Sequence, residues 1–87
     1  GYGEAFMRSG EGQLSYVGHG VGLEIDELPF LARGFEMPLE EGMVLAVEPK
    51  LTLPEIGVIG LEDTFLVTAR EAEALTEVPR DLTVLEP

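Results

Sequence analysis

The chain has 87 residues, no cysteine, and a net charge of −12 that comes from 17 acidic and 5 basic residues. A domain of this size buries a small core, so it usually needs a metal, a disulfide or a partner chain for stability. Without cysteine, a disulfide and a thiolate zinc site are both excluded, and the composition fits a cytoplasmic location. The negative charge argues against nucleic-acid binding, and no apolar run approaches the ~20 residues that span a membrane.

The first 17 residues carry two weak local signals. The apolar side chains before residue 8 and the glycines after it predict that residues 1–8 form the end of a helix. Residues 13–17 contain three apolar side chains and predict a short strand. This strand would run directly into the segment that holds the only histidine.

Residues 18–24 read Gly-His-Gly-Val-Gly-Leu-Glu. On an extended backbone every second side chain lies on one face, so His19, Val21 and Leu23 would point together. Glycine weakens a strand, so glycine inside a strand often marks a place where a ligand or a neighbouring backbone approaches closely. The segment therefore indicates a place where His19 meets another group.

The strongest strand signal lies at residues 43–48, where a continuous apolar run predicts burial on both faces. Pro49 follows at once and cannot donate a backbone hydrogen bond, which places Glu48 at a strand end or bulge. An edge strand is predicted at residues 50–53. Glu48 is therefore a carboxylate at the end of a buried strand.

Residues 56–68 predict a second long strand, in which Glu62 shares a face with Thr64. Other features are weaker: Pro29 is expected to end regular structure, residues 71–73 to form a turn or a short helical bend, and residues 75–78 and 82–85 to form short strands.

A buried carboxylate without a partner costs several kcal/mol, so Glu48 and Glu62 each need a cation or several hydrogen-bond donors. An imidazole combined with carboxylates suits Zn, Mn, Co or Fe(II). Against this, a single histidine in a strand is more often a hydrogen-bonded structural residue, and a glutamate at a strand end is more often solvated. The spacing of His19, Glu48 and Glu62 alone leaves both interpretations open.

Three segments change this balance, at residues 18–29, 39–49 and 60–68. Together they resemble three consecutive motifs of the pita-bread metallopeptidases, which include methionine aminopeptidase, aminopeptidase P, prolidase and the creatinase-like hydrolases. The similarity covers roughly residues 1–76 and is greatest to the Xaa-Pro peptidase branch. It implies an α+β fold class, here the C-terminal part of a pita-bread fold with a mainly curved antiparallel sheet and little helix. Residues 1–87 would form the C-terminal portion of the catalytic domain, without its N-terminal half.

The resemblance also implies a site. In this family two divalent ions (Mn, Co, Zn or Fe) are held by two Asp, one His and two Glu. His19 matches the histidine ligand, Glu48 the glutamate that binds one ion and moves a proton, and Glu62 the glutamate that bridges both ions. His19 and Glu48 are thereby expected to be catalytic, and all three to bind metal. The expected substrate is a peptide with proline in the second position.

The sequence departs from the family pattern in two ways. The aspartate pair and a further catalytic histidine belong before Gly1, so the chain alone is expected to be inactive and to bind metal weakly or not at all. A second histidine often follows the first by seven residues, and Asp26 stands there as a candidate substrate-binding residue. We also expect a homo-oligomer, because the truncation should expose a strand edge and apolar surface. The alternatives are a non-catalytic binding module of the same fold and a creatinase-like C–N hydrolase.

Overall fold

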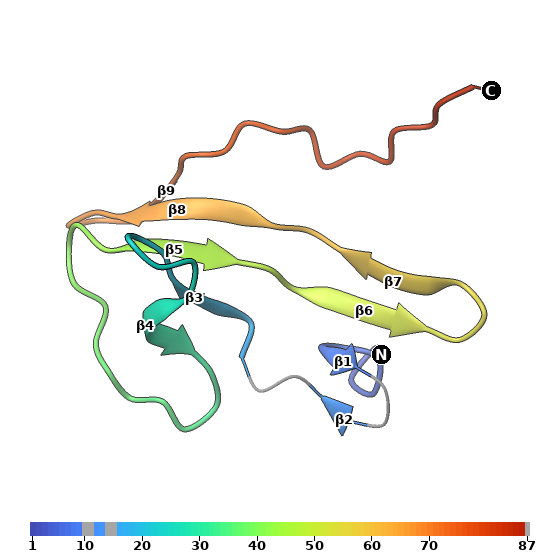
Figure 1. Ribbon diagram of the computed structural model, residues 1–87, viewed down its shortest axis with the longest axis horizontal. Coiled ribbons are helices and arrows are strands. Elements are labelled where there is room, and N and C mark those ends of the chain that lie inside the picture. The colour runs from blue at the N-terminus through green and yellow to red at the C-terminus, as the bar shows by residue number, and fades with distance from the viewer. Residues whose placement is uncertain (10–11, 14–15, 87) are drawn as a thin grey trace.

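The computed structural model describes residues 1–9, 12–13 and 16–86, and these residues contain no α-helix. They form one five-stranded sheet and two two-stranded sheets, and every strand pair is antiparallel (Figure 1). The strands are β1 (Arg8–Ser9), β2 (Gly12–Gln13), β3 (Gly18–Gly20), β4 (Glu27–Leu31), β5 (Val44–Val47), β6 (Lys50–Leu53), β7 (Gly57–Gly60), β8 (Asp63–Val67) and β9 (Ala72–Ala74). Across the described part of the chain, no helix has the length and apolarity to cross a membrane. The predicted antiparallel sheet with little helix is confirmed.

The five-stranded sheet has the order β4-β3-β5-β8-β9, which places β5 at its centre. The apolar sequence of β5 explains this position, because its side chains are covered from both sides. Leu45 and Ala46 are buried, with exposed fractions of 4% and 7%. The strand predicted at residues 43–48 is therefore confirmed, with Glu48 directly after its end.

Strands β5 and β6 continue into one another, as do β7 and β8, and together they make a long two-stranded arm (Figure 1). The pairs Val47–Asp63 and Lys50–Gly60 share one register on either side of a short break. At the break, the Leu61 N–H donates to the Pro49 carbonyl at 3.1 Å. Pro49 has no backbone N–H, so it cannot donate a hydrogen bond back to Leu61. The single long strand predicted at residues 56–68 is therefore wrong in detail, since Pro49 on its partner divides it.

Two other predictions near the start of the chain are corrected. The helix predicted at residues 1–8 is wrong: Phe6 forms a β-bridge with Leu51, and the Met7 N–H donates to the Lys50 carbonyl. Of the strand predicted at residues 13–17, only its first residue lies in β2, residues 14–15 are outside the described residues, and the rest is not strand.

The sequence suggested that Pro29 ends regular structure, and this is wrong. Pro29 is fully buried inside β4. This is possible because β4 is an edge strand, in which a missing backbone donor leaves no partner strand unsatisfied.

The C-terminal residues also differ from the prediction. Strand β9 occupies the expected turn, and no strand forms at residues 75–78 or 82–85. Instead, the tail after β9 runs back along β8 (Figure 1). The Leu75 N–H donates to the Thr64 carbonyl, and Arg80 reaches Asp63 at the start of β8.

The hydrophobic core is thin. Among the described residues, the buried apolar side chains are Met7, Leu45 and Ala46, together with Pro29. Large apolar side chains such as Leu23 and Ile25, in the loop between β3 and β4, lie in solvent. Packing within these residues therefore supplies little hydrophobic stabilisation, as the length of the chain suggested.

Candidate active site

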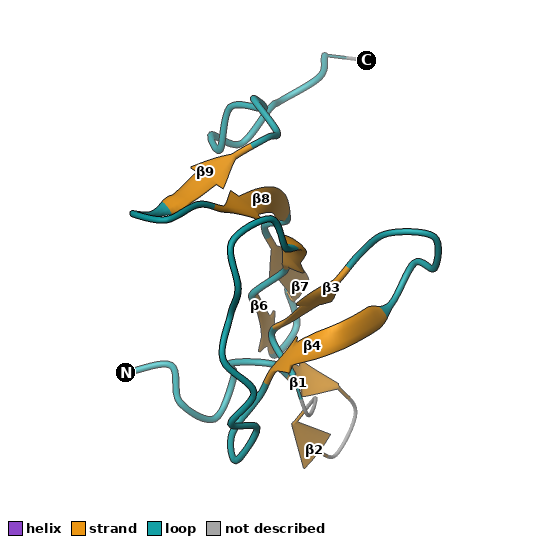
Figure 2. Ribbon diagram, turned by 90° about the vertical axis from the view of Figure 1, so that its left-hand side faces the viewer, coloured by secondary structure: helices purple, strands orange, loops and turns teal. Residues whose placement is uncertain are grey.

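His19 lies at the centre of β3, which is paired with β5 on one side and with β4 on the other, where Figure 2 shows the two strands side by side. His19 is buried, with 5% of its surface exposed to solvent. The glycines on either side allow this packing: a Cβ at Gly18 would lie 2.8 Å from the Ala46 carbonyl oxygen, and one at Gly20 would lie 2.7 Å from the Glu27 carbonyl oxygen. The expected close approach of neighbouring backbone is therefore present, and it holds His19 in a narrow space.

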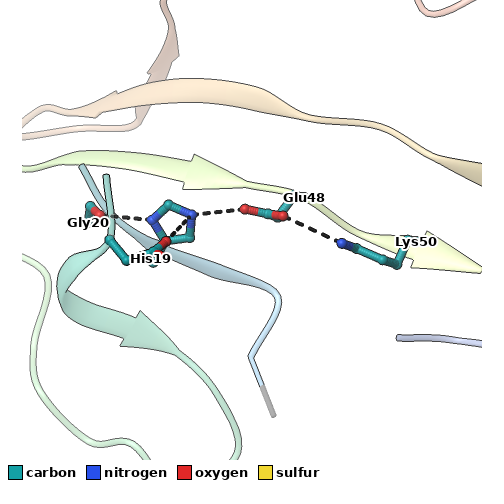
Figure 3. Close-up of polar contacts among 5 residues, drawn as sticks. His19, Gly20, Glu48 and Lys50 are labelled. Carbon is teal, nitrogen blue, oxygen red and sulfur yellow. Dashed lines mark hydrogen bonds and ion pairs between the residues drawn. The ribbon is translucent and has the colours of Figure 1, made fainter. Parts of the chain in front are cut away.

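Both ring nitrogens of His19 have partners (Figure 3). Nδ1 lies 2.9 Å from the carbonyl oxygen of Gly20, and Nε2 lies 2.8 Å from Oε2 of Glu48 and 3.0 Å from Oδ1 of Asp26. A carbonyl oxygen only accepts, so Nδ1 must carry a proton. In the neutral ring, Nε2 would then direct its lone pair at two carboxylates. The site therefore requires a cation at Nε2, either a proton or a metal ion.

The pKa of His19 reflects this arrangement. The hydrogen bond to the Gly20 carbonyl raises it most, burial lowers it, and the hydrogen bond to Glu48 together with the charges of Asp26 and Glu48 raises it further. The net result is a pKa above the ordinary value of 6.5. The chain thus stabilises positive charge at this position.

Glu48 reaches His19 because of strand pairing. His19 lies opposite Ala46, and the Glu48 N–H donates to the Val17 carbonyl at 2.8 Å, so the Glu48 side chain lies diagonally across from the imidazole. Partial burial by itself raises the pKa of the Glu48 carboxyl, but the hydrogen bond from His19, the Lys50 ammonium and the Glu62 side chain lower it, and the net shift is downward. Glu48 is therefore ionised at neutral pH.

Glu62 lies in the break between β7 and β8. The register that pairs Val47 with Asp63 and Lys50 with Gly60 places Glu62 opposite Glu48. Two carboxylates directly opposite one another destabilise a strand pair unless a proton or a metal ion lies between them. This arrangement again favours positive charge at the site.

The predicted site residues line one cavity of about 610 Å³. His19, Glu48, Glu62 and Asp26 all contribute to its wall, and Thr64 does so on the same face as Glu62, as the alternation predicted. Asp26 is 49% exposed in its side chain and lies close to His19. The structure therefore brings the four sequence-predicted residues together. His19 comes from β3, Asp26 from the loop that follows it, Glu48 from between β5 and β6, and Glu62 from between β7 and β8.

The donor atoms are of the types that bind divalent metal ions, because an imidazole nitrogen and carboxylate oxygens line the same cavity. Their arrangement is incomplete: within the described ranges, no group of three or more His, Asp or Glu side chains is placed to hold a metal ion. His19, Glu48 and Glu62 are the residues that would supply ligands. A complete coordination shell needs further donors.

Two residues at the cavity were not predicted from the sequence. Lys50 contributes its ammonium, 3.5 Å from Oε1 of Glu48 (Figure 3). Tyr16 directs its ring edge-to-face toward His19, with the centroids 6.1 Å apart. Lys50 follows Glu48 by two residues, so strand alternation was a usable signal for it. Tyr16 precedes β3 without regular structure and gave no such signal.

Comparison with known proteins decides the family. Residues 1–69 match the model of metallopeptidase family M24. The chain belongs to this family. Membership in M24, a metallopeptidase family, implies a divalent-metal site, and the prediction of the pita-bread metallopeptidase family is confirmed.

The M24 chain is similar both to curated proteins by sequence and to solved structures. An Xaa-Pro dipeptidase of Pyrococcus furiosus is 43% identical over 82 residues, which are 94% of this chain and 22% of that protein. The structure of an Xaa-Pro dipeptidase from Bacillus anthracis matches 98% of the chain with a TM-score of 0.82 and 42% identity. The structure of an X-Pro aminopeptidase from Thermotoga maritima MSB8 matches with a TM-score of 0.83 and 34% identity. The M24 chain spans about a fifth of the length of these proteins, 22% in each case.

Proposed function

We propose that the protein containing this chain is a metal-dependent peptidase that removes the N-terminal residue from peptides with proline in the second position. One observation carries the proposal. Nε2 of His19 faces two carboxylates while Nδ1 is bound to a carbonyl, and Glu48 and Glu62 lie opposite one another beside it. Three donors that all require a cation, in a family of metallopeptidases, support metal binding at this cavity.

Each residue has a distinct role in the proposed reaction. His19, Glu48 and Glu62 would hold the divalent metal, with the remaining ligands from other parts of the protein. When bound, divalent ions polarise the scissile carbonyl and lower the pKa of a water molecule toward neutrality. Glu48 accepts a proton from this water as its oxygen bonds to the carbonyl carbon. Glu48 then donates the proton to the proline nitrogen as the C–N bond breaks, which releases an amino acid and a proline N-terminus.

The details of the assembly belong to the same proposal. We expect two ions of Mn, Co, Zn or Fe, a homo-oligomer, a cytoplasmic location, and residues 1–87 as the C-terminal portion of the catalytic domain. Asp26 contacts Nε2 of His19 at 3.0 Å and lines the cavity, which supports a place near the substrate. The thin core and the exposed apolar side chains support contacts with further protein.

The rival functions make different predictions. A binding module of the same fold would need no metal ion, because a proton on His19 can satisfy the two carboxylates, and it would show no metal-dependent hydrolysis. A creatinase-like hydrolase would cleave a small C–N substrate and leave Xaa-Pro peptides untouched. The relatives named above are described as Xaa-Pro peptidases, which favours the peptide substrate.

The test uses the intact protein, loaded in turn with each of the four metals. Hydrolysis of Ala-Pro is measured, with creatine as the alternative substrate. Glu48→Gln keeps the size of the side chain and removes its base, so kcat should fall about 10²- to 10⁴-fold. Glu36→Gln, in an exposed loop, removes the same charge and should leave kcat unchanged. Absence of Ala-Pro hydrolysis with every metal would refute the proposed function, and full activity of Glu48→Gln would refute the role of Glu48.

A further inference from the structure

Glu62 lies where the strand pairing of the long arm is interrupted. Strand β7 ends at Gly60 and β8 begins at Asp63, so Glu62 belongs to neither strand. The ladder between the two halves of the arm stops at one of these residues and resumes at the other. His19, by contrast, is buried in β3 between two paired strands. The direction of the Glu62 side chain therefore depends on how the residues beside it are held.

Asp63 is the first of these neighbours. Glu62 and Thr64 both line the 610 Å³ cavity, so alternation along the chain directs the Asp63 side chain to the opposite face. Asp63 is buried, with 9% of its surface exposed, in a chain of net charge −12. A buried carboxylate needs hydrogen-bond donors or a cation. The partners of Asp63 therefore decide how firmly the start of β8 is fixed.

Those partners come from the C-terminal tail, which runs back along β8 (Figure 1). Oδ1 of Asp63 accepts a hydrogen bond from the Thr76 hydroxyl at 2.6 Å, and Oδ2 accepts from Nε and Nη2 of Arg80 at 3.1 and 2.9 Å. The next residue is held as well: the Thr64 N–H donates to the Thr76 hydroxyl oxygen at 3.2 Å, and the Leu75 N–H donates to the Thr64 carbonyl at 2.8 Å. The tail thus holds two successive residues at the start of β8. Asp63, Thr76 and Arg80 are called the tail clasp below.

The tail clasp supplies geometry more than stability. The Arg80 side chain is 61% exposed, against 12% for Asp63, and ion pairs with an exposed partner contribute little to stability. A rigid guanidinium that donates from two nitrogens, with a hydroxyl on the other oxygen, instead fixes a carboxylate in one orientation. Thr76 and Arg80 also lie beyond residue 69, where the match to the M24 family model ends, so family membership does not account for them.

We propose that Thr76 and Arg80 are positioning residues for metal binding, which act through Asp63 to fix the direction in which Glu62 faces the cavity. This inference rests on the proposed function, in which Glu62 is a metal ligand. It adds to that function a link between the C-terminal tail and the metal site. Without the tail clasp, the Glu62 carboxylate has to be ordered when the ion binds, which lowers the affinity for the ion.

The test measures Co²⁺ binding by the intact protein, because the visible absorption of bound Co²⁺ depends on its coordination geometry. Arg80→Met should weaken binding about 10-fold and change the spectrum, as the loss of residues that orient metal ligands does. Thr76→Val removes the hydroxyl and should act in the same direction. Arg80→Lys keeps the charge and should restore part of the affinity. Arg70→Met removes the same charge at an exposed bend and should change neither the affinity nor the spectrum.

A double-mutant cycle separates positioning from a general loss of stability. Glu62→Gln should weaken Co²⁺ binding by itself. Because Arg80 is proposed to act through Glu62, adding Arg80→Met to Glu62→Gln should cause no further loss. An equal loss from Arg80→Met in both backgrounds would mean that the tail clasp only stabilises the fold, and would overturn the inference. Unchanged affinity and an unchanged spectrum in Arg80→Met would overturn it as well.

Hydrolysis of Ala-Pro, measured on the same samples, separates this inference from the proposed function. Co²⁺ binding that depends on Arg80, without hydrolysis of Ala-Pro with any of the four metals, would refute the proposed peptidase and support the positioning role. Hydrolysis of Ala-Pro together with Co²⁺ binding that is independent of Arg80 would overturn this inference alone. Absence of Co²⁺ binding by the wild type would refute the metal site and the inference with it.

Discussion

Nε2 of His19 lies 2.8 Å from Oε2 of Glu48, while Nδ1 of the same ring is committed to the carbonyl of Gly20. This relationship fixes which nitrogen faces the cavity. It also makes a cation necessary there, because a neutral imidazole would place a lone pair against a carboxylate. A protonated ring satisfies this need when no metal is bound, so proton and metal compete for one atom.

The first prediction concerns the protonation of His19 in the metal-free chain, where it is the single histidine. Its pKa should lie above 6.5, and Glu48→Gln should lower it because the amide oxygen that replaces the carboxylate carries no charge and accepts a weaker hydrogen bond. Because the pKa is higher in the folded than in the unfolded state, protonation stabilises the fold below pH 6.5, and this contribution is lost as pH rises through the raised pKa. Imidazole chemical shifts followed by NMR over pH measure the effect.

Dispersed amide resonances serve as the control that the chain and its variant are folded. Asp26→Asn should lower the pKa of His19 as well, because the charge of Asp26 also raises it. An imidazole that titrates below 6.5 in the folded chain would contradict the geometry described at Nε2.

The second prediction concerns the glycines beside His19. Gly18→Ala would place a Cβ 2.8 Å from both the Ala46 carbonyl oxygen and Cδ1 of Leu31. Overpacking of this kind costs about 1–3 kcal/mol, and here it would also displace His19. We expect the free energy of unfolding of the intact protein to fall by this amount in chemical denaturation. Gly3→Ala is the control, since its added Cβ meets nothing within 4 Å. Equal stability of the two variants would show that β3 has more space than the structure gives it.

Much of the sheet could be predicted from short stretches of sequence. The apolar run at residues 43–48 predicted the central strand, and Pro49 correctly placed Glu48 at its end. Alternation predicted that Glu62 and Thr64 share a face, and both line the cavity. These inferences succeed because burial and strand period act over a few residues.

The failures come from long-range pairing. The helix predicted at residues 1–8 is replaced by backbone contacts with Lys50 and Leu51, which no local pattern reveals. Pro29 fits inside a strand because that strand lies at a sheet edge, which depends on the order of strands. The opposition of Glu48 to Glu62 likewise depends on a register between distant segments.

The third prediction concerns the attachment of the C-terminal tail. Asp63 accepts hydrogen bonds from the Thr76 hydroxyl at 2.6 Å and from two nitrogens of Arg80 at 3.1 and 2.9 Å. Asp63→Asn removes the charge that pairs with Arg80 and leaves one acceptor oxygen in place of two, so the tail should detach from β8. The Leu75 N–H, which donates to the Thr64 carbonyl, should then exchange faster with solvent in hydrogen-exchange experiments.

The same contacts predict an acid-dependent change. The hydrogen bond from Thr76 lowers the pKa of Asp63 most, burial raises it, and Arg80 lowers it, with a net shift below the ordinary value of 3.8. The stabilisation is therefore fully present above pH 3.8 and is lost as pH falls through the lowered pKa. Asp81→Asn, which removes the same charge from an exposed position in the tail, should leave the exchange of Leu75 unchanged. Identical exchange in both variants would mean that Asp63 does not hold the tail.

The last prediction concerns metal binding by the 87-residue chain alone. It supplies an imidazole from His19 and carboxylates from Glu48 and Glu62, and the part of the chain described here has no group of three side chains already placed around a metal. These three side chains must be ordered around one point when an ion binds, and the donors that would complete its coordination shell are missing, so the net affinity is low. Calorimetric titration with Mn²⁺ or Zn²⁺ should therefore show weak binding of at most one ion, weaker again in His19→Ala. Tight binding of two ions by the isolated chain would show that these three residues suffice, and would remove the need for aspartate ligands from elsewhere in the protein.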